Sequence, residues 1–190
     1  MSKLKLFGTT SHSFIQAAPT SSGETFTLPG EGASNPGLGG MYLSTPKAAN
    51  STSILFDDVP VWASKIIIMF GDVDMPSEHL KIKLGTSSNI ISTGYVETST
   101  NDGGGGQTNF TDSFGFFNNA SNAGFSGIMT IVKFSSTEYT EFHAGRFQGT
   151  GASHGGGYLS GVSETITRVE ITLSGGGSFT SGKINIRYEA

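Results

Sequence analysis

The sequence predicts an all-β fold, an antiparallel β-sandwich of the jelly-roll type that follows an extended N-terminal arm. From residue 51 onward, short apolar runs recur between turns of Gly, Ser, Asn and Pro. No stretch of about ten residues has the 3-4-7 apolar spacing of an amphipathic helix. Several runs alternate between apolar and polar residues, as half-buried strands do. Roughly eight to ten such runs suit a two-sheet domain.

The first fifty residues differ from the rest. Their apolar residues form clusters long enough for single strands but too sparse for a core: Leu4, Leu6, Phe7, Phe14, Ile15, Phe26 and Leu28. Such strands cannot bury enough apolar surface to offset the entropy of ordering them. We therefore expect residues 1–50 to be an arm for docking and oligomerisation, with a glycine-rich joint at 30–40, and residues 51–190 to be the sandwich head.

The longest apolar run of the head is at residues 66–70. Five large apolar residues in succession predict a strand that is covered on both faces. A turn is expected at 71–77. Beyond it, Leu80, Ile82 and Leu84 alternate with lysines, which predicts a strand with one face in water.

The middle of the chain predicts strands near residues 90–96, 114–117, 124–134 and 139–147, the last two forming a hairpin. Two glycine-rich segments, 98–108 and 149–157, are expected to be loops. At the end, residues 169–173 and 184–188 alternate strictly, with three glycines between them. This pattern predicts a half-exposed hairpin.

Composition excludes several classes of partner. The net charge is −4 and no run of Lys or Arg occurs, so the chain lacks the basic surface that binds nucleic acid. The absence of cysteine excludes disulfides and thiolate metal sites. No segment approaches the ~20 apolar residues of a membrane span, and no secretory signal is expected, so synthesis in a cytoplasm is predicted.

Motifs for catalysis or cofactor binding are absent, so we expect a non-enzymatic protein with no catalytic residue and no cofactor. The four histidines lack HxH or HExxH spacing, and no GxSxG motif occurs. His143, which lies within an expected strand, is interpreted as a partly buried or surface residue. Asp72, Asp74 and Glu78 crowd one turn and are a weak candidate for a hard cation, but the pattern favours a solvated turn over a cation site.

Polar residues in the two glycine-rich segments are the candidate ligand contacts: Asn101, Asp102, Gln107, His154 and Tyr158. Most aromatic residues are expected in the core. Any exposed ones beside these loops would stack on sugars or on a neighbouring subunit.

Several segments resemble, in order and spacing, a C-terminal domain of tailed-bacteriophage tail-fibre and related virion proteins. They are FDDVPVWASKIIIMF at 56–70, IKLG at 82–85, STGY at 92–95, SGIMTIV at 126–132 and ITRVEITLSGGGSFTSGKINIRYE at 166–189. In addition, FIQAAPTSSGETFTLPGEG at 14–32 is similar to stem segments of phage fibres. The resemblance implies a homotrimeric virion protein that contacts other capsid or tail proteins.

Three alternatives stay open at this point. A short arm with a compact head also suits a capsid decoration protein, which would stabilise the phage head. A receptor-binding tip would present its loops to a host surface glycan. A polysaccharide depolymerase would need two carboxylates held ~5–9 Å apart in a groove, which sequence cannot reveal.

Overall fold

A computed structural model describes residues 40–118, 123–149 and 151–190, together with the backbone of four short strands nearer the N-terminus. These four are β1 (Lys3–Phe7), β2 (His12–Gln16), β3 (Glu31–Gly32) and β4 (Asn35–Pro36). Among the described residues, β1 pairs with β2 alone and β3 with β4 alone, in two separate antiparallel ladders. The apolar clusters at 4–7 and 14–15 therefore lie in strands, whereas Phe26 and Leu28 lie outside the described residues.

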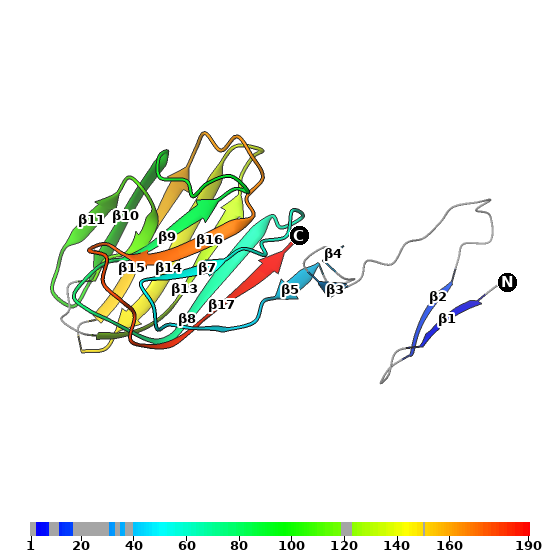
Figure 1. Cartoon of the computed structure of the whole chain (residues 1–190), viewed down its shortest axis with the longest axis horizontal. Coiled ribbons are helices and arrows are strands. Elements are labelled where there is room, and N and C mark those ends of the chain that lie inside the picture. The colour runs from blue at the N-terminus through cyan, green and yellow to red at the C-terminus, as the bar shows by residue number, and fades with distance from the viewer. Residues whose placement is uncertain are drawn as a thin grey trace.

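The rest of the described chain is all-β, with two antiparallel sheets packed as a sandwich (Figure 1). The sequence-based fold class is confirmed. The nine-stranded sheet contains β5 (Met41–Leu43), β6 (Lys47–Ala48), β8 (Lys65–Met75), β10 (Tyr95–Asn101), β11 (Gln107–Phe110), β13 (Ala123–Lys133), β14 (Tyr139–Phe147), β15 (Gly151–Leu159) and β17 (Ser181–Glu189). The four-stranded sheet contains β7 (Ser53–Phe56), β9 (Leu80–Gly85), β12 (Phe114–Phe116) and β16 (Arg168–Leu173).

The strand order of the large sheet is β11-β10-β15-β14-β13-β8-β17-β5, and β6 also pairs with β17. The large sheet thus begins at residue 41, before the expected boundary at residue 50. The order in the small sheet is β12-β9-β16-β7. None of the described segments is a helix with the length and hydrophobicity that a membrane crossing requires.

The core lies between the two sheets and is rich in aromatic rings. Phe116 contacts Phe125 with ring centroids 4.6 Å apart, and Phe125 contacts Phe147 at the same distance. The alternation expected at Leu80, Ile82 and Leu84 is confirmed, because all three are fully buried. Contacts of this kind stabilise a domain that has no disulfide.

Three expectations about strands were wrong. β8 continues through residues 71–75, where a turn was expected, and Asp72 has a φ of +51° at the irregular position. Both glycine-rich segments were expected to be loops, but 149–157 is mostly strand β15, and within 98–108 β10 continues to Asn101 and β11 begins at Gln107. The final two strands form no hairpin, because β16 pairs with β7 and β9 in the small sheet whereas β17 pairs with β8 in the large sheet. The connection between them crosses from one sheet to the other.

Candidate functional site

The carboxylates that were the weak candidate for a cation lie at the end of β8 and just after it, and each is held by hydrogen bonds. The Asp72 carboxylate accepts from the Gln148 amide at 2.9 Å, and the Asp74 carboxylate accepts from the Ser181 hydroxyl at 2.8 Å. Glu78 Oε2 accepts from the Gly175 N–H at 2.6 Å. Each carboxylate thus has a different partner, and the three are not among the described groups of His, Asp and Glu that converge on one point.

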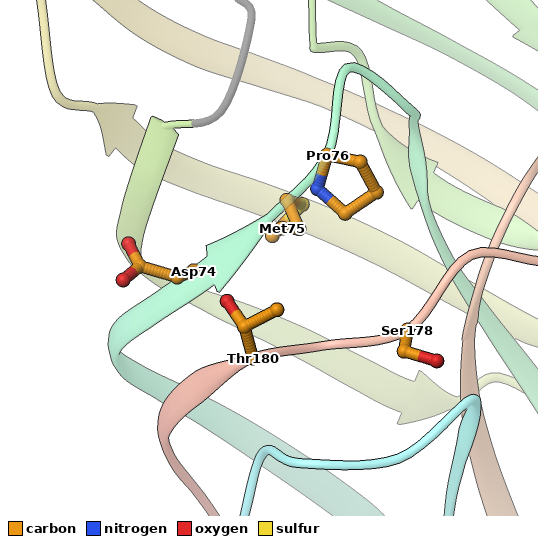
Figure 2. A pocket seen from close by; sticks show the side chains of 5 residues that line it. All are labelled: Asp74, Met75, Pro76, Ser178 and Thr180. Atoms are coloured by element: carbon orange, nitrogen blue, oxygen red, sulfur yellow. The ribbon is translucent and has the colours of Figure 1, made fainter.

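A surface pocket of ≈ 410 Å³ lies beside the end of β8 (Figure 2). It is lined by residues from the end of β8 and from the segment before β17: Asp74, Met75, Pro76, Ser178 and Thr180. The pocket contains one carboxylate and two hydroxyl groups. This lining offers polar contacts but no acid–base pair.

The candidate ligand residues do not form one site. Asn101 is buried, and its side-chain oxygen accepts from the Gly103 N–H at 2.9 Å, which shapes the turn. Asp102 and His154 come together at the surface, with 3.9 Å between Oδ2 and Nδ1. Gln107 is exposed at the start of β11. Tyr158 lies elsewhere on β15 and donates to Glu138 Oε1 at 2.5 Å.

The outer face of the large sheet exposes large apolar side chains on four consecutive strands. Val96 on β10 is 70% exposed and Phe142 on β14 is 60% exposed. Tyr158 on β15 and Ile128 on β13 are exposed as well. We call these four residues the outer apolar face. A group of exposed apolar residues on neighbouring strands is typical of an interaction surface.

The inner face of the same sheet carries a buried polar cluster that the sequence analysis missed. β10 contributes Glu97 and Ser99, and β14 contributes Glu141 and His143. All four are buried. β15 lies between β10 and β14, and it carries glycine at positions 155 and 157, which pair with these four residues.

Glycine on β15 is what allows the flanking strands to meet. Gly157 pairs with Glu97 on one side and with Glu141 on the other. Gly155 pairs in the same way with Ser99 and His143. Because no side chain rises from β15 at these positions, side chains from β10 and β14 reach each other above it.

The cluster is connected by short contacts. Ser99 Oγ lies 2.9 Å from His143 Nε2, and His143 Nδ1 lies 2.6 Å from Glu141 Oε1. Glu97 Oε1 lies 3.6 Å from the same Nδ1. The small sheet adds backbone donors, because the Gly115 N–H donates to both Glu97 oxygens at 2.9 Å.

Burial changes the acid–base behaviour of the two carboxyl groups. It raises the pKa of Glu97 to about 10, and the nearby Glu141 carboxylate adds to this rise. Burial also raises the pKa of Glu141, although the hydrogen bond with His143 opposes the shift. Two negative carboxylates in one desolvated site repel each other, so a proton or another cation between Glu97 and Glu141 would be stabilising.

The contacts from Ser99 through His143 to Glu141 have the connectivity of a serine-hydrolase triad. However, the Ser99 side chain is fully buried, and its Oγ also accepts from the Phe117 N–H at 3.0 Å. A nucleophile must reach its substrate. The described sandwich covers this serine with β12 and the residues that follow it, so the arrangement favours a structural role.

Comparisons of the chain with protein-family models, with curated proteins and with solved structures find no match.

Part of the cluster has a signal in the sequence. Glu97 and Ser99, like Glu141 and His143, stand at alternate positions of their strands, so each pair shares one face. Tyr95 and Tyr139, which are buried, stand two residues before each pair and mark that face as the inner one. Only the strand order reveals that the two pairs meet.

Proposed function

We propose that this protein is a non-enzymatic structural protein of a tailed-bacteriophage particle, a short trimeric fibre or tail-fibre-type component with a β-sandwich head. The observation that carries the proposal is the outer apolar face. In a monomer, Val96 and Phe142 would lie in water. Burial of such side chains contributes roughly 1.5–3 kcal/mol each, so their exposure supports a contact with a second copy of the chain.

The N-terminal strands support the same proposal. β1 and β2 are each five residues long and pair with no strand of the sandwich. An isolated two-stranded hairpin is at best marginally stable in water. Pairing or packing against other copies, or against a capsid or tail protein, would stabilise these strands, which is the role of an arm.

The proposal is tested by locating the protein. Antibodies raised against residues 40–190 should label intact phage particles at the head or at the tail, and a chain that lacks residues 1–30 should fold without joining the particles. If the particles carry no label, or if the truncated chain occupies them fully, the proposal is wrong.

A second candidate function is a receptor-binding tip for a host surface glycan. It is favoured by Phe142 and Tyr158, two exposed aromatic rings on adjacent strands of the outer apolar face, because aromatic rings stack on sugars. Purified protein would then compete with phage for adsorption to the host. A capsid decoration protein would instead change the resistance of particles to heat.

A further inference from the structure

We propose that Glu97, Glu141 and His143 bind one divalent transition-metal ion, with Zn²⁺ as the representative, between the two sheets. Among the described residues, these three form the one group of potential ligands whose atoms converge, all within 4.8 Å of one another. They come from two strands that are not neighbours, and glycines of β15 leave the space above the intervening strand. The site is thus built by the sheet and not by a flexible loop.

An unpaired oxygen points to a missing positive partner. Glu141 Oε2 is buried and has no hydrogen-bond partner, although Oε1 of the same carboxylate contacts His143. A buried carboxylate oxygen without a partner is costly. A proton shared between His143 and Glu141 satisfies Oε1 alone, whereas a metal ion can be shared by both oxygens of Glu141 and by Glu97.

Charge balance favours a dication. The side chains of Glu97, Glu141 and His143 have no exposed surface, so water does not screen the two carboxylates from each other. A divalent ion with two carboxylates and a neutral imidazole gives a site with no net charge.

Ser99 prepares His143 for this role. When Nε2–H donates to Ser99 Oγ, the lone pair of Nδ1 faces the two carboxylates. Ser99 can in turn donate to Ser153 Oγ, which lies 3.2 Å away. In this tautomer Nδ1 and Glu141 Oε1 are both acceptors, and their 2.6 Å separation is stable only with a proton or a metal ion between them. On a tetrahedral ion with bonds of about 2.1 Å they would move apart to about 3.4 Å, a small side-chain rotation.

The ligand types select the class of metal. Calcium and magnesium prefer sites made wholly of oxygen, whereas an imidazole nitrogen with carboxylates suits zinc and its first-row neighbours. The site lies between the two sheets, so the ion would have a structural role. We expect the ion to bind while the protein folds.

Because the site is buried, the test adds the metal ion while the protein refolds. Full-length protein is unfolded in guanidinium with EDTA, then refolded either with one equivalent of ZnCl₂ or with EDTA, and passed over a desalting column. We expect one zinc per chain by inductively coupled plasma mass spectrometry. We also expect the thermal midpoint to be higher by roughly 10 °C than that of the EDTA sample.

Matched variants separate this site from zinc bound elsewhere. Glu141→Gln should retain less than a tenth of the zinc, whereas Glu164→Gln, which changes an exposed carboxylate, should retain all of it. If Glu141→Gln fails to fold, the zinc content and the midpoint of the wild-type chain still decide the matter. Wild-type protein with no retained zinc and equal midpoints would overturn the proposal, as would equal zinc retention by wild type and Glu141→Gln.

Discussion

Ser99 Oγ and His143 Nε2 lie within hydrogen-bond distance, 2.9 Å apart, although a whole strand, β15, separates the strands that carry them. Neighbouring strands lie about 4.8 Å apart, so the two backbones are separated by roughly 10 Å. The contact exists because Gly155 has no side chain between them. The glycines of β15 are thus a structural requirement of the buried polar cluster.

Gly155→Ala tests this requirement directly. A Cβ at this position would lie 2.2 Å from the Thr98 carbonyl oxygen and 2.7 Å from His143 Cε1, so the backbone and the imidazole would have to move. We expect the free energy of unfolding in urea to fall by about 1–3 kcal/mol or more. The control is Gly71→Ala, where the nearest atom is 3.8 Å away. Equal losses in the two variants would show that the cluster does not need glycine at position 155.

His79 should make stability depend on pH in the neutral range. Burial lowers its pKa below 6.5, and the charge of Lys81 adds to the effect. A pKa lowered by folding contributes stability that is present above pH 6.5 and is lost as the pH falls through the folded value. Wild type should therefore lose more stability than His79→Gln between pH 7 and pH 5, measured by urea unfolding. Parallel pH profiles for the two chains would argue against this role.

Ser99 should not behave as an enzyme nucleophile, despite its contact with His143. Its side chain is fully buried in the sandwich, so a reagent in solution cannot approach the Oγ. We expect no adduct after incubation of the folded protein with a fluorophosphonate, measured by intact mass spectrometry. A serine protease treated in parallel shows that the reagent is active. An adduct that is lost in Ser99→Ala would show that the serine is reactive.

Phe142→Thr should weaken association between copies without unfolding the chain. The ring is 60% exposed, so its removal costs the isolated sandwich little. Loss of its burial at an interface should raise the dissociation constant about tenfold, measured by sedimentation equilibrium. Thr140→Ala, on the same strand and also exposed, is the matched control. If both variants associate as wild type does, the outer apolar face is not the contact.

Alternating apolar and polar residues predict which segments are strands with one buried face. They do not predict which strands pair with each other. Val169 and Ile184 stand in two clear strands, yet the pattern is the same whether those strands pair with each other or belong to opposite sheets. The glycine run at 155–157 indicates a loop by propensity alone. It is a strand because side chains from β10 and β14 fill the space that glycine leaves.

The buried polar cluster could not be predicted as a unit, because the sequence does not show which strands are neighbours. Glu97 and His143 are 46 positions apart in the numbering, and no local pattern indicates that β15 inserts between their strands. The charged residues at inward positions of two strands were a usable signal, since charges are rarely buried without a partner. The strand order is needed to show that the charged residues of β10 and those of β14 are partners of each other.

Copies of this chain are proposed to assemble through the outer apolar face and the N-terminal strands. The most direct test is the mass of the full-length protein in solution, measured by sedimentation equilibrium over a range of concentrations. The account predicts a homotrimer of three times the 19.8 kDa chain mass. A species of one chain mass at every concentration, up to the highest that stays soluble, would contradict it.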